Sequence, residues 1–86
     1  MRIEKKVWKK YFELIKSGKK TYDLRLADFE CCEGDTLILK EWDEDKNEYT
    51  GREVVKKVTY VGKIKDMPFW KPEDIKKYGF QIISFK

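Results

Sequence analysis

Hydrophobic residues recur along the chain with two periods. They recur every second residue in the segments expected to be strands, and every third or fourth residue in those expected to be helices. Residues 2–7 are expected to form a short strand. One helical stripe follows it, made of Trp8, Tyr11, Phe12 and Ile15. Gly18 suits the left-handed position just past a helix end. We interpret the aromatic stripe as plain core packing.

The segment 21–26 alternates as a strand, with two chemically different faces. One face holds Tyr22, Leu24 and Leu26, and the other holds Thr21, Asp23 and Arg25. The polar face therefore sets a carboxylate beside a guanidinium, just after a glycine and a lysine pair. This corner between a helix and a strand is the first candidate site.

The rest of the chain reads as strands, turns and one more helix. Residues 29–32 are expected to extend the pairing before a turn at Gly34-Asp35. The clearest strand is 36–42, rich in branched and aromatic residues, and residues 43–47 are expected to form a polar hairpin tip or a longer loop. The remaining expected segments are a strand at 52–61, irregular chain or a frayed strand at 62–68, a short helix at 70–79 and a final strand at 80–85.

This order, strand–helix–strand–strand–strand–helix–strand, predicts one domain over residues 1–86. Short connections favour an antiparallel sheet, and curling the sheet into a barrel would protect its edges. The predicted fold is therefore α+β: a small mixed, mainly antiparallel β-barrel with two short helices.

Composition limits the chemistry. The 86 residues include no histidine, which excludes Ser-His-Asp and Cys-His mechanisms, so catalysis would have to use Lys, Tyr, Thr, Asp or Glu. Adjacent Cys31 and Cys32 fit no metal or redox spacing, and we expect one buried and one exposed thiol. No metal or cofactor is expected. Abundant Lys and Glu resemble the composition of heat-adapted proteins.

Charge is unevenly distributed. Residues 1–25 carry 9 positive and 3 negative groups, residues 26–50 carry 2 and 9, and residues 51–86 carry 9 and 4. A basic face that attracts phosphate is one expectation, and a solvated surface of mixed sign is the other. With no apolar run long enough for a membrane span and no apolar signal core, we expect a cytoplasmic protein. A monomer is expected, although the sequence does not give the oligomeric state.

The segment Gly18 to Arg25, "GKKTYDLR", resembles the G-x-K-x-x-E-x-R signature of the ASCH domain family, which belongs to the PUA-like β-barrel group. Further blocks look like the same family in the same order: "VWKKYFELI" its first helix, "GDTLILKEW" its turn and central strand, "YTGR" with "VVKKVTYV" the next strand, and "FQIISF" the last. The motif's glutamate is Asp23 here, and a histidine frequent near the N-terminus of relatives is missing.

The resemblance implies a cleft beside the first helix, lined by the motif and used for RNA binding or for chemistry on nucleosides. One branch looks like a small amidohydrolase acting on N-acylated cytidine. Lys20 matches the catalytic lysine of that branch, whereas Asp23 stands where the branch has a threonine, so a hydroxyl nucleophile is absent.

Four residues of the motif could contact a ligand. Gly18 would let backbone N–H groups approach, Lys20 offers a cation for phosphate, Arg25 can hold phosphate bidentately, and Asp23 can accept from a base amine or orient Arg25. A structural ion pair between Asp23 and Arg25, closing the mouth of the barrel, is the alternative. Lys19 is expected to be solvated.

The sequence leaves two functions of the cleft open, besides a role as a protein-interaction or toxin-associated accessory domain. In the first, the cleft binds single-stranded RNA or a modified nucleotide, with a base stacked on an aromatic residue; the candidates, each of which could instead be core, are Trp42, Tyr49, Phe69 and Trp70. In the second, Lys20 acts as a base on an N-acylated cytidine, assisted by Asp23 or by an acid at residues 73–74.

Overall fold

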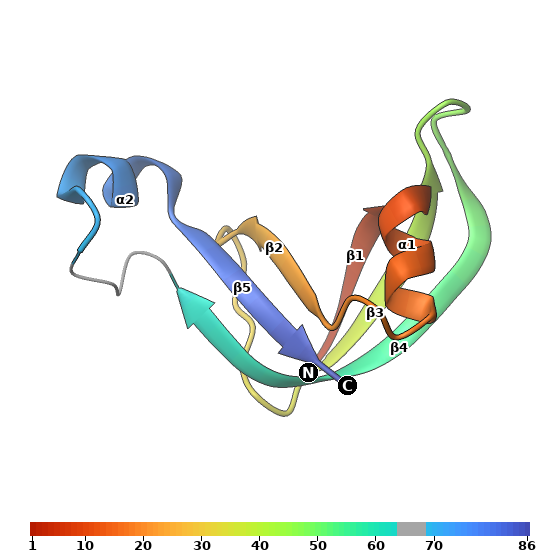
Figure 1. Ribbon diagram of the computed structural model, residues 1–86, viewed down its shortest axis with the longest axis horizontal. Coiled ribbons are helices and arrows are strands. Elements are labelled where there is room, and N and C mark those ends of the chain that lie inside the picture. Colours follow the sequence, from red (N-terminus) through yellow and green to blue (C-terminus); the bar gives the residue numbers. More distant parts are fainter. Residues whose placement is uncertain (64–68) are drawn as a thin grey trace.

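The computed structural model describes residues 1–63 and 69–86 (Figure 1). The elements follow the predicted order: β1 (Arg2–Trp8), α1 (Lys9–Lys16), β2 (Tyr22–Leu26), β3 (Thr36–Asp43), β4 (Glu48–Lys63), α2 (Pro72–Tyr78) and β5 (Phe80–Phe85). The α+β class, with a mixed sheet and two short helices, is confirmed.

All five strands form one sheet in the order β1-β3-β4-β5-β2. Only the β1–β3 pair is parallel, and the other three pairs are antiparallel. Strand β4 belongs to both halves of the sheet, because its first part pairs with β3 and its second part with β5. In Figure 1 this long strand curves beneath the molecule and joins the two halves.

The core lies on the face of β1 and β3 that α1 covers. Phe12 and Ile15 of α1 are buried there with strand residues that include Val7, Leu37 and Leu39. These side chains recur every second residue along each strand and every third or fourth along the helix, so one apolar face of each element is used. The core thus fixes α1, and with it the corner that leads into β2.

The sheet is open, whereas the sequence predicted a closed barrel. Strands β1 and β2 are its two edges, and no backbone ladder joins them within residues 1–63 and 69–86. Figure 1 shows the two strands rising from the base of the molecule and parting from each other. The space between these edges decides where the candidate site lies.

The predicted strand at residues 29–32 was wrong. Phe29 and Cys31 do point toward the core, which gives the alternating pattern, but the segment runs as a loop. Asp35 closes that loop, because its carboxylate accepts a hydrogen bond from the Cys32 N–H at 2.9 Å and its own N–H donates to the Cys32 carbonyl. Alternating burial here reflects packing without a partner strand.

Strand β4 is longer than predicted, since it begins at Glu48 and not at residue 52. Gly51 lies inside it with a φ of 95°, next to an irregularity in the pairing with β3 between Lys40 and Trp42. Glycine tolerates this left-handed backbone, so the strand continues through a bulge. The segment expected to be irregular or a frayed strand, residues 62–68, starts with two strand residues, and 64–68 lie outside the described residues.

Helix α2 stands at the far end of β5 from α1 (Figure 1). Its proline at the start, acids in the first turn, lysines in the last turn and left-handed Gly79 match the predicted signals. Within the described residues, neither helix has the length and apolar character that crossing a bilayer requires.

Candidate functional site

A cleft of about 700 Å³ lies between the two edge strands, beside the end of α1. Residues from β1, α1, β2 and the loops next to them line it: Lys5, Lys6, Val7, Trp8, Tyr11, Lys20, Tyr22, Asp23, Leu24, Arg25, Leu26, Asp28 and Phe29. Four of these side chains are cationic, two are anionic and four are aromatic. The cleft is therefore basic and rich in aromatic side chains.

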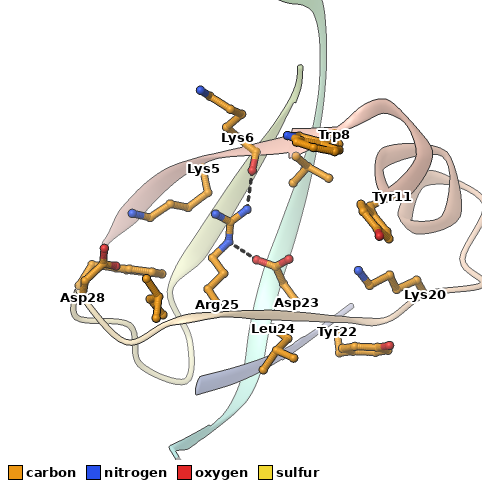
Figure 2. Close-up of a pocket in the computed structure, with 13 residues that line it drawn as sticks. Lys5, Lys6, Trp8, Tyr11, Lys20, Tyr22, Asp23, Leu24, Arg25 and Asp28 are labelled. Atoms are coloured by element: carbon orange, nitrogen blue, oxygen red, sulfur yellow. Dashed lines mark hydrogen bonds and ion pairs between the residues drawn. The ribbon is translucent and has the colours of Figure 1, made fainter. Parts of the chain in front are cut away.

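Arg25 spans this opening (Figure 2). Its Nε donates to the Asp23 carboxylate, and its Nη2 donates to the backbone carbonyl of Lys6 on β1 at 2.6 Å. A guanidinium has five N–H donors, so Nη1 keeps donors that no described residue accepts. The ion pair that the sequence left open is formed, and the arginine still offers part of its fork to the cleft.

Strand β2 turns its polar face inward. Asp23 is only 6% exposed, whereas Tyr22, Leu24 and Leu26 on the opposite face are each about half exposed. The two faces are those predicted from alternation. Their orientation means that the carboxylate and the guanidinium face β1 across the cleft, while the apolar side chains point away from it or line its rim.

Lys20 reaches into the same cleft between two tyrosine rings. Its ammonium lies 4.6 Å from the ring centroid of Tyr11 and 5.1 Å from that of Tyr22. Both distances are within the range of cation–π attraction, which holds the lysine on the side of the cleft nearest α1. Lys20, Asp23 and Arg25 thus line one cavity, as the motif predicted (Figure 2).

Gly18 has a different position from the one predicted for a ligand contact. It ends α1 with a φ of 84°, and its N–H donates to the Ile15 carbonyl at 3.1 Å. The lining of the cleft, as far as the structure describes it, does not include Gly18. Its N–H is used to terminate the helix, so its contribution is to aim the chain from α1 toward Lys20.

The sequence singled out none of the four aromatic residues of the cleft, which are Trp8, Tyr11, Tyr22 and Phe29. Trp8 and Tyr11 belong to the stripe interpreted as core packing, but only Phe12 and Ile15 of that stripe are buried. Trp8 is 53% exposed and stands at the rim, where the picture shows its ring above Asp23 and Arg25 (Figure 2). The sequence contained one indication of this. Trp8 precedes the helix and Tyr11 is in its first turn, so both lie beyond the part of α1 that covers the core.

The four aromatic candidates lie elsewhere. Trp42 and Tyr49 are neighbours across β3 and β4, with ring centroids 5.0 Å apart and nearly perpendicular planes. Phe69 and Trp70 contact each other just before α2, and both are exposed. None of the four is in the core cluster formed by the described residues, and none lines the cleft there.

Gln81 is a further polar residue that the sequence did not single out. It lies on β5 directly opposite Arg25 and is fully buried. Neither polar atom of its amide has a hydrogen-bond partner among the described residues. A glutamine within the apolar strand "FQIISF" was the signal, because buried amides are normally paired.

A second arginine–carboxylate cluster joins α1, β3 and β4. Arg52 donates from Nε and Nη2 to the Glu41 carboxylate at 2.9 and 2.7 Å and also contacts Glu13, while Thr50 donates to Glu41 at 2.5 Å. The hydrogen bond from Arg52 is the largest cause that lowers the pKa of Glu41 to about 2. Both charges are thus held in their ionised forms.

The two cysteines match the prediction, because Cys31 is buried and Cys32 exposed, both as free thiols. Burial is the main cause that raises the pKa of Cys31, which makes it a poor nucleophile. In the described part of the chain no three His, Cys, Asp or Glu side chains gather as a metal site would require.

Fold and site together define a class: a small α+β domain whose mixed sheet opens between its edge strands onto a basic, aromatic cleft. The family model described as "Domain of unknown function (DUF3850)" matches residues 4–72, and the chain belongs to this family. The matched range contains β1 from residue 4 onward and all of α1 and β2, and it includes every residue in the described lining of the cleft.

Two individual proteins are similar to the chain. An uncharacterized 12.9 kDa protein in the GpA 3′ region of Escherichia phage P2 is 41% identical over 63 residues, which are 73% of this chain. The chain spans 56% of the length of that phage protein. The crystal structure of hypothetical protein PH0355 has a TM-score of 0.68 at 24% identity, with 100% of this chain and 98% of that one covered, which shows a shared fold.

Proposed function

We propose that the cleft between β1 and β2 binds a nucleotide unit of RNA. The observation that carries this proposal is the convergence of Lys20 and Arg25 with exposed rings in one cavity of about 700 Å³, whose lining also includes Lys5 and Lys6. Cations attract the phosphate, and aromatic side chains stack a base at roughly 1–3 kcal/mol per base. The volume is within the range typical of small-molecule sites.

The roles within the cleft follow from the contacts. Arg25 meets the phosphate with the Nη1 donors that Asp23 and Lys6 leave unused. Asp23 fixes the guanidinium in that direction. Lys20, which rests between two tyrosine rings, supplies a second cation, and the ring of Trp8 at the rim is available to a base.

Salt dependence and one pair of lysine variants test the proposal. A fluorescently labelled single-stranded RNA is titrated with protein at several salt concentrations, and the logarithm of the affinity should fall with a slope of roughly −0.7 per phosphate contact. Lys20→Ala should weaken binding by up to roughly fivefold, as expected for the loss of one solvent-accessible ion pair that contributes about 1 kcal/mol or less. Lys19→Ala, one residue away and outside the cleft lining, removes the same charge and should have little effect.

Affinity that does not change with salt, or an equal loss in the Lys20 and Lys19 variants, would contradict the proposal. Equal loss would mean that general surface charge, and not the cleft, attracts RNA. Circular dichroism of both variants checks that they are folded.

The alternative function, hydrolysis of an N-acylated cytidine, draws on the presence of Lys20 and Asp23 in the same cleft. The acids at residues 73–74 lie on exposed α2, and the cleft's described lining does not contain them. Asp23 already accepts from Arg25, so it is poorly placed to take a proton. Incubation with N-acylated cytidine and chromatography distinguish the two: turnover that the Lys20→Ala variant lacks would favour the hydrolase.

We also infer that the open sheet corresponds to a PUA-like barrel that is not closed between β1 and β2. We further infer that the DUF3850 family is related to the ASCH domains. The motif positions that suggested the relationship, Lys20, Asp23 and Arg25, all line the cleft. Arg25 reaches β1 where a closed barrel would have backbone pairing.

A further inference from the structure

Three aromatic residues form a row across the outer face of the sheet. Trp8 of β1 is in register with Trp42 of β3, which is in register with Tyr49 of β4. Directly opposed residues share a face, and this face is the one turned away from core residues Leu37 and Leu39. Trp8 and Tyr49 are 53% and 52% exposed, so both ends of the row are accessible.

The row connects two hollows. Trp8 lines the cleft between β1 and β2, and Tyr49 lines a second hollow of about 190 Å³ with Lys40, Gly51, Arg52 and Glu53. Gly51 contributes no side chain, and a Cβ added there would meet nothing within 4 Å. Three neighbouring strands span about 10 Å, which exceeds the size of a single base.

Cations accompany the row. The Lys6 ammonium lies 3.8 Å from the ring centroid of Trp42, and the Lys40 ammonium lies 5.9 Å from that of Tyr49. Lys40 also pairs with Glu4 at 3.2 Å, so Lys6 is the cation with more of its charge available. Rings with adjacent cations are what single-stranded nucleic acid requires, because every base has a face to stack and every step has a phosphate.

We propose that the ligand is a single strand of RNA at least three nucleotides long, which continues from the cleft over Trp8 and across Trp42 to Tyr49. This inference rests on the proposed function, because the first nucleotide occupies the cleft. A base that stacks on Trp42 displaces the Lys6 ammonium from the ring, and the freed ammonium meets the neighbouring phosphate. The last base stacks on Tyr49 beside the second hollow.

Uridine monophosphate and a uridine trinucleotide, each titrated into the protein and followed by nuclear magnetic resonance, test the inference. The trinucleotide should bind at least about tenfold more tightly, since each stacked base adds roughly 1–3 kcal/mol, or about 5–150-fold. Tyr49→Ala should remove roughly fivefold or more of that gain and leave the affinity for the monophosphate unchanged. Tyr49→Phe, which keeps the ring, should retain the gain.

Tyr60→Ala is the matched control. Tyr60 is on the same strand, is 66% exposed and lies outside the row, so both affinities should be unchanged. Equal binding of the monophosphate and the trinucleotide, or equal loss for both ligands in Tyr49→Ala, overturns the inference while the cleft proposal stands. No binding of either ligand to the unaltered protein refutes the proposed function itself.

Discussion

The Asp23–Arg25 pair in the cleft and the Glu41–Arg52 pair beside α1 use the same chemistry in different surroundings. Glu41 receives hydrogen bonds from Arg52 and Thr50, and the same guanidinium also contacts Glu13. Arg25 has one carboxylate and one backbone carbonyl, with a cavity in front of its remaining donors.

The difference separates a structural pair from a pair suited to binding. Arg52 contacts two carboxylates, from β3 and α1, so its positive charge is neutralised within the protein. Arg25 has only one carboxylate partner in the described chain and lies among three lysines that line the same cleft. Its charge is therefore available to an incoming anion. Variants of the Asp23–Arg25 pair should lose ligand affinity, whereas variants of the Glu41–Arg52 pair should lose stability.

The largest expected difference comes from removing one arginine or the other. Arg25→Ala should lower the affinity for uridine monophosphate by roughly 10–100-fold, because hydrogen bonds to charged groups contribute about 1.5–3 kcal/mol. Arg52→Ala should leave this affinity within about twofold and lower the urea concentration at which half the protein unfolds. Nuclear magnetic resonance titration and urea unfolding measure the two effects.

Arg25→Lys keeps the charge of the cleft but not the fork, and an intermediate affinity is expected from it. Should Arg25→Ala and Arg52→Ala weaken monophosphate binding equally, the distinction between the two pairs would be lost.

A smaller, pH-dependent effect is expected from Glu41→Gln. Its stability loss at pH 7 should be roughly 1–3 kcal/mol, since a charged hydrogen bond becomes a neutral one. The pKa of Glu41 is lowered from 4.5 to about 2, so its contribution is complete above pH 4.5 and is lost as the pH falls toward 2. The difference between the two proteins in urea unfolding should shrink over that interval.

Asp35 and Asp43 also have lowered pKa values, each mainly through a backbone N–H, so the unaltered protein and the Gln variant should both lose stability in acid. Only their difference reports on Glu41. A difference that is constant from pH 7 to pH 2 would show that the Glu41 charge does not stabilise the fold.

The smallest effect is expected from Asp23→Asn. The amide oxygen can still accept from Arg25, so stability should change by less than in Glu41→Gln, while looser orientation of the guanidinium should weaken monophosphate binding by about twofold to fivefold, less than the full charged contact. Urea unfolding measures the change in stability, and titration with uridine monophosphate measures the change in affinity. A stability loss as large as that of Glu41→Gln would make Asp23 a structural residue.

The order of elements could be predicted because local signals agree with the fold. The periodicity of α1, the glycine after it and the branched residues of β3 each favour the secondary structure that these segments adopt. The motif residues Lys20, Asp23 and Arg25 were identified correctly as neighbours, since alternation along β2 places Asp23 and Arg25 on one face.

Other features depend on contacts between distant segments. The sequence did not reveal that β1 and β2 part, because whether a curled sheet closes depends on the register of strands far apart in the chain. Trp8 and Tyr11 were assigned to the core because periodicity gives the face of a helix but not how far the neighbouring sheet extends. The early start of β4 was missed because Gly51 usually interrupts a strand, and here it forms a bulge.

The contact between Arg25 and the Lys6 carbonyl also bears on self-association. Edge strands expose unpaired backbone groups that can recruit a strand from another chain, and charged side chains are a common protection against such growth. Along β1 the carbonyl of Lys6 is occupied by the guanidinium, and the neighbouring lysines would repel a second copy of the same edge. The side chain that spans the cleft thus also blocks one route to aggregation.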